Sequence, residues 1–350
     1  MIDSQAILDA LKPVKDEERK QSIVEAGRVR DISIDGGTVT FTLALTTTAG
    51  MVKDLIVEDC EKAVTALDGV EAVEIAVVTL PKPLPSQQGI EDVKHIIAIS
   101  SGKGGVGKSS VAVNVAIALA QSGAKVGLLD ADIYGPNVPN MMGVGEVELK
   151  VDKSGGQDVL QPEFNYGVKF VSMAFLIDPD QPVMWRGPMI NSMVRQFLYQ
   201  VNWGELDYLL VDMPPGTGDA QLTMAQAVPM AGAIIVTTPQ TVSLLDSRRG
   251  LKMFQQMNVN LLGIVENMSY FIPPDMPEKQ YDLFGSGGGE KTAKELDVPL
   301  LGCVPLEIAL REGGDNGKPI VMAQPESASA KALIAIAGAI ADKVSVPAIA

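Results

Sequence analysis

The sequence predicts an α/β fold, in which a mostly parallel sheet is covered by helices on both faces and is preceded by a small α+β domain. After residue 92 of this 350-residue chain, short apolar segments alternate with helical segments, and wholly apolar strands are typical of buried parallel sheets. Before residue 80, two segments alternate apolar and polar side chains around a turn, which predicts an antiparallel hairpin. A proline-rich stretch separates the two patterns and predicts a linker.

The first domain, expected over residues 1–80, has the pattern α-β-β-α-β. Helical spacing in SQAILDALKPV is followed by RVRDISID and TVTFTLALT, which flank the turn at Asp35-Gly36-Gly37 and form the predicted hairpin. VKDLIVEDCEKAVTAL then has the spacing of a helix, and VEAVEIAVV alternates as a strand. The linker is expected over residues 81–92.

The second domain is expected over residues 93–350. Its predicted strands are HIIAIS, KVGLLD, VKFVSMAF, DYLLVDM, GAIIVTT and LLGIVEN. Parallel strands of this kind gather their carboxyl ends at one edge of the sheet, and ligands bind there. We therefore expect the functional site at that edge.

The overall charge argues against nucleic acid as the main partner. The chain has 28 basic and 43 acidic residues, a formal net charge of −15, and would repel a phosphate backbone. It has no apolar run long enough to span a bilayer and no charged-then-apolar leader, so we expect no membrane partner. Its two cysteines, Cys60 and Cys303, have the spacing of neither a disulfide framework nor a metal motif, which indicates a cytoplasmic protein.

The segment ISSGKGGVGKSS contains the pattern of a phosphate-binding loop, Gly102-x-x-x-x-Gly107-Lys108-Ser109, between a predicted strand and a predicted helix. In such a loop, glycines let backbone N–H groups point at phosphates, the lysine reaches the β- and γ-phosphates, and the serine hydroxyl holds Mg²⁺. We therefore expect a P-loop NTPase domain that binds ATP and Mg²⁺. The expected nucleotide-binding residues of the loop are Gly102, Lys103, Gly104, Gly105, Val106, Gly107, Lys108, Ser109 and Ser110.

Three aspartates at the ends of predicted strands are the candidate carboxylates of this site. Asp212 ends YLLVD, as expected of a carboxylate that holds Mg²⁺ through water. Asp130 and Asp132 end LLDAD, where one can sit near the metal and the other can orient the attacking water. The alternative, stronger for Asp130, is that one of them caps the helix after Gly135. We expect catalytic roles for Asp132 and Asp212.

The loop carries a second lysine, Lys103, which lies too early to share the position of Lys108. A γ-phosphoryl transition state gains from an extra positive charge, and a cation here can point at the phosphates of a second subunit, like an arginine finger supplied in trans. The alternative is a solvated surface lysine. This loop resembles that of the deviant Walker A ATPases, which include MinD, ParA and the nitrogenase iron protein. The resemblance implies a nucleotide-dependent homodimer in which Lys103 is catalytic across the interface.

Further motifs are similar to those of the Mrp-type branch, the ATP-dependent iron–sulfur cluster carriers. Over residues 90–345 they are GLLDADIYGPNVPNMMG, WRGPMI, YLLVDMPPGTGD, VTTPQTVSLLDSRRG, IVENMSYF and REGGDNGKPI. The N-terminal unit resembles the iron–sulfur-assembly domain often fused ahead of this branch, through IVEAGRVRDISI and LTTTAG. The resemblance implies an ATP-hydrolysing carrier or assembly factor whose partners are apo iron–sulfur client proteins or assembly factors. It also implies Asn267 as the adenine contact and Asp246 as a partner of the trans lysine.

The chain departs from the family pattern at the cluster-binding motif. Mrp-type carriers place Cys-Pro-x-Cys after MSYF, where this sequence has Pro273 and Met276, and Gly50 stands where the N-terminal domain usually has a reactive cysteine. Neither a proline nor a thioether replaces a thiolate ligand. Cys303, expected just after a strand, is the candidate ligand of an iron–sulfur cluster, with a buried structural thiol as the alternative; Cys60 is expected in the core. The competing function is an Mrp-like ATPase that has lost cluster binding and acts as a scaffold or as a regulatory or positional switch.

Overall fold

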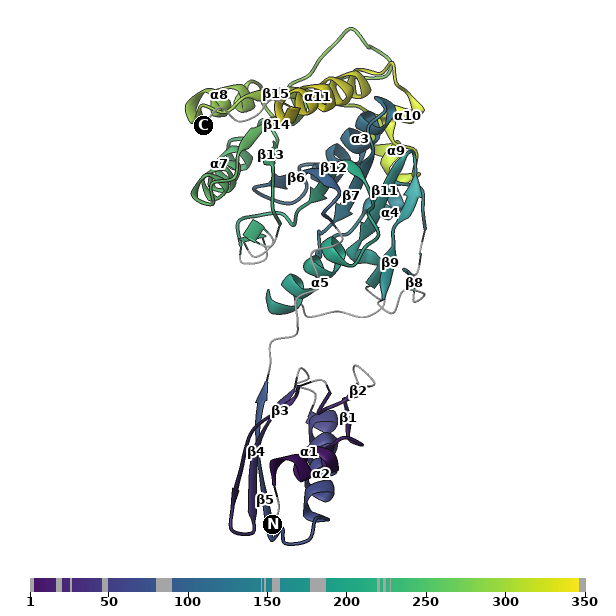
Figure 1. Ribbon diagram of the computed structural model, residues 1–350. Helices are drawn as coiled ribbons and strands as arrows, with labels where there is room; N and C mark the ends of the chain where they lie inside the picture. Colours follow the sequence, from purple (N-terminus) through teal and green to yellow (C-terminus); the bar gives the residue numbers. More distant parts are fainter. Residues whose placement is uncertain are drawn as a thin grey trace. The chain divides into compact units, whose positions relative to one another are not determined.

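A computed structural model divides the chain into two compact units, residues 1–84 and 85–350 (Figure 1). Residues 81–89 of the predicted linker lie outside the part that the structure describes. The described residues are 3–16, 21–25, 27–45, 50–79, 90–145, 147, 149–152, 158–176, 187–218, 221–222, 225–226 and 228–345.

The small unit packs two helices against a three-stranded sheet of order β3-β4-β5. β3 and β4 form the predicted antiparallel hairpin, and β5 runs parallel to β4. The predicted α-β-β-α-β order is confirmed, with one additional hairpin, β1–β2, whose two-residue strands are too short for an alternating pattern to reveal. The elements are α1 (Ser4–Leu11), β1 (Lys15–Asp16), β2 (Gln21–Ser22), β3 (Val29–Asp35), β4 (Thr38–Leu45), α2 (Gly50–Thr65) and β5 (Ala72–Thr79).

The large unit is built on an eight-stranded sheet of order β10-β11-β7-β12-β6-β13-β14-β15. Its strands run parallel except β10, which lies antiparallel to β11 at one edge, so the predicted mostly parallel sheet is confirmed. The strands are β6 (Val93–Ser101), β7 (Val126–Asp130), β10 (Glu163–Asn165), β11 (Val168–Ser172), β12 (Leu206–Asp212), β13 (Gly232–Thr237), β14 (Leu261–Phe271) and β15 (Leu300–Leu306).

Helices cover both faces of this sheet, as predicted (Figure 1). One face packs against α3, α10 and α11, and the other against α5, α7 and α8. In the described part of the chain, none of the helices has both the length and the apolar character needed to cross a bilayer. The remaining elements are α3 (Lys108–Gln121), α4 (Val138–Met141), β8 (Lys150–Asp152), β9 (Val159–Gln161), η2 (Met173–Leu176), α5 (Gly187–Tyr199), α7 (Thr241–Gln256), α8 (Gly288–Leu296), α9 (Ile308–Asp315), α10 (Ile320–Ala323) and α11 (Ala328–Ser345).

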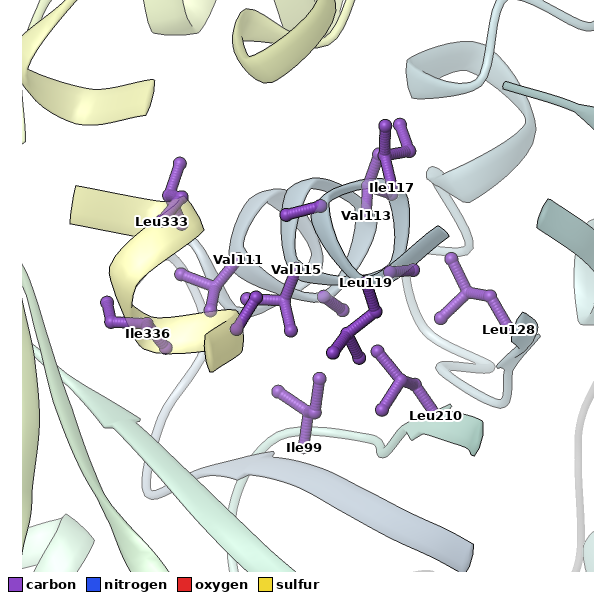
Figure 2. Packing of buried hydrophobic residues seen from close by; sticks show 14 of the residues in the cluster. Ile99, Val111, Val113, Val115, Ile117, Leu119, Leu128, Leu210, Leu333 and Ile336 are labelled. Atoms are coloured by element: carbon purple, nitrogen blue, oxygen red, sulfur yellow. The ribbon is translucent and has the colours of Figure 1, made fainter. Parts of the chain in front are cut away.

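The central strands are apolar throughout because both of their faces are buried. Figure 2 shows Val115 and Leu119 of α3 above Ile99 of β6 and Leu210 of β12, with Ile336 of α11 beside them. The alternate side chains of the same strands enter the second core, on the opposite face of the sheet. Because β6 runs parallel to β12 and β13, the loop that leads from its end to α3 lies at the carboxyl edge of the sheet.

Two expectations at strand ends differ from the structure. The predicted strand VKFVSMAF ends at Ser172, where the serine hydroxyl accepts a hydrogen bond from the N–H of Ala174 at 3.1 Å and the chain continues as the 3₁₀ helix η2. Cys303 was expected just after a strand, but it lies inside β15, opposite Glu266 of β14. The apolar segment LLGCVPL continues through the cysteine, so its pattern does not mark a strand end there.

Candidate nucleotide site

The loop between β6 and α3 is shaped by its glycines. Gly105 and Gly107 have φ of +79° and +81°, in the left-handed region that favours glycine, and Gly107 is the N-cap of α3. Gly102 packs so closely on α7 that a Cβ there would overlap the backbone of Asp246 and Ser247. The loop therefore needs glycine both for its conformation and for its approach to α7.

Lys108 begins α3 and is almost fully buried, at 5% exposure. Its Nζ lies 2.5 Å from Oδ1 of Asp212 and 3.4 Å from Oδ2 of Asp132. Burial opposes the charge, but Asp212 and Asp132 outweigh it and raise the pKa of the Lys108 ammonium above its ordinary value. The hydroxyl of Ser109 donates to the second oxygen of Asp212 at 2.5 Å, so one carboxylate joins both loop side chains.

Asp130 organises the neighbouring loop from a fully buried position. Its Oδ2 accepts hydrogen bonds from the Ser172 hydroxyl at 2.7 Å and from the N–H of Val138, the first residue of α4, at 3.2 Å. Its Oδ1 accepts from the N–H of Asp132 at 3.2 Å. Burial, together with the charge of Asp212, raises the pKa of Asp130 to about 7. Asp130 thus does what the capping alternative expected, because it satisfies an N–H at the start of a helix after Gly135.

Asp132 faces the loop from the end of β7. Its Oδ2 is the oxygen near Lys108, and its Oδ1 accepts from the N–H of Tyr134 at 3.2 Å. Burial raises the pKa of this carboxyl, and Lys108 opposes that shift. The predicted pair Asp132 and Asp212 is therefore brought together around one ammonium group.

A cavity of about 370 Å³ opens over the loop, and its lining includes residues 103–110, Asp132 and Pro215. Asn267, at 3% exposure, donates from Nδ2 to the carbonyl of Val106 at 2.8 Å, while its buried Oδ1 has no partner among the described residues. A glycine loop at the start of a helix, a buried lysine, a serine hydroxyl and an acidic strand end form a set of groups that fits a nucleotide with a divalent cation. Asn267 is not among the residues that line this cavity, but its unpartnered buried Oδ1 is an acceptor of the kind that the amino group of a base needs.

Lys103 is half-buried and does not project freely into solvent. Its Nζ donates to Oε1 of Gln240, just before α7, at 3.2 Å. Asp246, which the resemblance implies as a partner of the trans lysine, has its own ion pair with Arg249 at 3.1 Å within the same helix. Sequence reasoning missed Gln240, because nothing in the spacing of VTTPQTVSLLDSRRG links it to a loop 137 positions earlier.

Neither cysteine is among the residues that line this cavity. Cys60 is buried in α2, and burial raises the pKa of its thiol to about 12. Cys303 is half-buried; its thiol donates to Oε1 of Glu266 at 3.8 Å, and burial and then the Glu266 charge raise its pKa. Met276, in the segment that replaces Cys-Pro-x-Cys, is 40% exposed. Among the residues that the structure describes, no three His, Cys, Asp or Glu side chains form a group that could hold a metal ion.

The parallel sheet and the glycine loop at the start of α3 are the features of a P-loop NTPase. Residues 92–341 match the sequence profile of the NUBPL iron-transfer P-loop NTPases, and the chain belongs to this family. Residues 4–77 match the family described as iron-sulfur cluster assembly protein. The predicted resemblance is confirmed for both parts of the chain.

Named relatives extend over most or all of the chain. The iron-sulfur cluster carrier protein of Synechocystis sp. is 69% identical over 352 residues, covering 100% of both chains. The iron-sulfur cluster transfer protein NUBPL of Mus musculus is 48% identical, over 74% of this chain and 80% of that protein. The iron-sulfur cluster carrier protein of Escherichia coli is 46% identical, over 77% of this chain and 73% of that protein.

Solved structures resemble the large unit. A nucleotide-binding protein from Archaeoglobus fulgidus in complex with ADP is 36% identical, with a TM-score of 0.59 over 69% of this chain and 92% of that one. The septum site-determining protein MinD from Pyrococcus horikoshii, complexed with Mg-ADP, is 25% identical, with a TM-score of 0.54 over 72% of this chain and 97% of that one. These likenesses agree with the P-loop NTPase fold.

Glu266 is predicted to slow the chemistry of the Cys303 thiol. Because burial and Glu266 raise the pKa of Cys303, iodoacetamide is expected to alkylate it slowly at neutral pH and faster as the pH rises. Glu266→Gln removes the negative charge and keeps the side-chain shape, so alkylation is expected to become faster, although burial still raises the pKa of the thiol. Mass spectrometry measures the rate, and Cys60, whose pKa burial raises to about 12, is the slow-reacting control in the same protein. Equal rates in the two proteins would contradict this role of Glu266.

Proposed function

We propose that the protein is an ATP-binding and ATP-hydrolysing iron–sulfur cluster carrier or assembly factor that works in the cytoplasm as a nucleotide-dependent homodimer. The observation that carries this proposal is that the Asp212 carboxylate binds both Lys108 and Ser109, which directly follow the glycine loop. Family membership and the named relatives support the carrier function. The proposed domains are residues 1–80, a linker at 81–92 and the ATPase at 93–350, and we propose neither nucleic acid nor membrane as a partner.

The loop residues divide the work of binding ATP. Backbone N–H groups of the loop and the charge of Lys108 receive the phosphates. Ser109 and, through water, Asp212 hold Mg²⁺, which supplies positive charge beside the phosphates when bound. Asn267 presents its free buried oxygen to the base. The carboxylates of Asp212 and Asp132 raise the pKa of the Lys108 ammonium and hold it in place.

Two residues are proposed to act in hydrolysis itself. Asp132 orients the attacking water, because its carboxylate lies at the cavity and is held there by the N–H of Tyr134. Lys103 lends its charge to the transition state of the partner subunit's site. Lys103 lines the same cavity as Lys108, but its ammonium is bound by Gln240 and not by the carboxylates that bind Lys108, which supports a role other than binding the phosphates of its own loop.

The trans role of Lys103 predicts complementation between two inactive variants. Lys103→Ala and Asp132→Ala are each expected to bind ATP but to lose turnover, since both residues act on the transition state. In a mixed dimer, one of the two composite sites has both residues intact. Random mixing makes about half of the dimers mixed, so phosphate release is expected to recover to about a quarter of the wild-type rate.

The control for this experiment is a mixture of Lys103→Ala with an Lys103→Ala, Asp132→Ala double variant, in which no composite site is intact. Tagged subunits and pull-down establish that mixed dimers form. Mixed dimers that form without any recovery of hydrolysis would contradict the trans role.

The proposed cargo is an iron–sulfur cluster, handed to apo client proteins or assembly factors. Thiolates are the usual ligands of such clusters, and Pro273 and Met276 provide none. Cys303 is the proposed ligand in this chain, and its raised pKa disfavours the thiolate that would bind iron. We therefore propose labile binding, with coordination completed by thiols of a client or of a small molecule.

Anaerobic reconstitution with iron and sulfide tests this cargo. Wild-type protein is expected to retain less than a full cluster per dimer after desalting, and more when a small thiol is present. Cys303→Ala is expected to lose this iron and sulfide, whereas Cys60→Ala is the matched control and is expected to keep them. A stable stoichiometric cluster in Cys303→Ala would contradict the ligand assignment.

The same observations on the cysteines favour a second candidate function. The absence of cysteines from the segment after MSYF and the raised pKa of Cys303 are what an Mrp-like ATPase would show if it had lost cluster binding and acted as a scaffold or a regulatory or positional switch. Reconstitution distinguishes the two, because this candidate predicts no bound iron or sulfide with or without added thiol.

A further inference from the structure

The contact between Lys103 and Gln240 has no part in the chemistry described so far. The ammonium donates to the Gln240 side-chain carbonyl at 3.2 Å. Gln240 is the N-cap of α7, with φ −62° and ψ 133°, but its side chain does not cap the helix. Its amide is therefore available to hold Lys103.

The backbone of Lys103 is fixed to its own subunit. The Ser101 hydroxyl donates to the carbonyl of Lys103 at 3.0 Å. The adjacent Gly102 lies against the backbone of Asp246 and Ser247 with no room for a side chain. Loop and helix α7 are thus held together, and the long Lys103 side chain is left as the part that can change partners.

The acceptor that holds Lys103 is neutral. The carboxylate of Asp246, one and a half turns into α7, is engaged by Arg249 at 3.1 Å. A neutral amide binds an ammonium less strongly than a carboxylate does, so this contact is strong enough to orient the side chain and weak enough to be exchanged.

We propose that Gln240 is a positioning residue that holds the Lys103 ammonium on its own subunit and releases it when a second copy of the chain presents its bound phosphates. The inference rests on the proposed trans role of Lys103. This contact between Gln240 and Lys103, which we call the latch, reduces the population of free Lys103. It therefore sets how readily the composite site is completed. A carboxylate at residue 240 would hold Lys103 more tightly, and removal of the acceptor would free it.

The cis contact can be tested without hydrolysis. In nucleotide-free protein, acetic anhydride is expected to modify Lys103 at least twofold faster in Gln240→Ala than in wild type, and at least twofold slower in Gln240→Glu. Mass spectrometry gives the rates, with exposed Lys94 as internal reference. Gln255→Glu, an exposed change of equal charge at the far end of α7, is the control and is expected to leave the Lys103 rate unchanged. Equal Lys103 rates in all four proteins would overturn the contact.

Steady-state hydrolysis tests the latch. Gln240→Glu is expected to lower kcat at least threefold and Gln240→Ala to raise it, with KM for ATP unchanged in both, because the Gln240 side chain binds Lys103 and not Lys108 or Ser109, the side chains proposed to bind the phosphates and Mg²⁺ of the same subunit. Gln255→Glu is expected to keep the wild-type kcat. A purely structural role would move the two Gln240 variants in the same direction, and a fall of kcat in both would overturn the proposal.

The complementation experiment separates the two claims. Recovery in mixed dimers together with a wild-type kcat in Gln240→Glu would leave the trans role standing and overturn the latch. Mixed dimers without recovery would remove the trans role on which the latch rests, whereas the acetylation rates would still report whether Gln240 holds Lys103.

Discussion

The ion pair between Lys108 and Asp212 is the contact on which the site depends. The two residues are 104 positions apart, and they meet because β12 lies parallel to β6 with Asp212 opposite Ile99. An ammonium buried without a partner would cost several kcal/mol, so the start of α3 can hold its buried lysine only where a strand end supplies a carboxylate. Ser109 on the same carboxylate fixes the first turn of the helix, and the glycine loop then has both ends set.

The neighbouring strands extend this arrangement. Asp130 ends β7 beside Asp212, and its bonds to Ser172 and Val138 tie β11 and α4 to the same edge of the sheet. Asp132 is thereby directed back at Lys108. The side chains proposed to act on the nucleotide thus hold one another in place. At the proposed cluster ligand, burial and the Glu266 charge raise the pKa of the Cys303 thiol and so disfavour the thiolate, which is why we propose coordination shared with other thiols.

Much of this arrangement could be predicted from the sequence because it is local or follows from the parallel sheet. The spacing from Gly102 to Ser109 contains the loop, and apolar runs ending in Asp130 and Asp212 mark strand ends that must meet at one edge. The contacts of Gln240 with Lys103 and of Glu266 with Cys303 join distant segments through particular rotamers, which no periodicity records. The two-residue strands of β1–β2 and the end of β11 at Ser172 depend on hydrogen bonds too local to alter a hydrophobic pattern.

The most direct test of the account is calorimetric titration of Mg-ATP into wild type and Lys108→Ala. Lys94→Ala is the matched control, since Lys94 is an exposed lysine of the same strand–loop–helix unit, paired with Asp207 away from the loop. Far-ultraviolet circular dichroism establishes that each protein is folded. The account predicts wild-type affinity for Lys94→Ala and a loss of at least about 100-fold for Lys108→Ala, as expected when charged hydrogen bonds to phosphates are removed. A folded Lys108→Ala protein that binds Mg-ATP as tightly as wild type would contradict it.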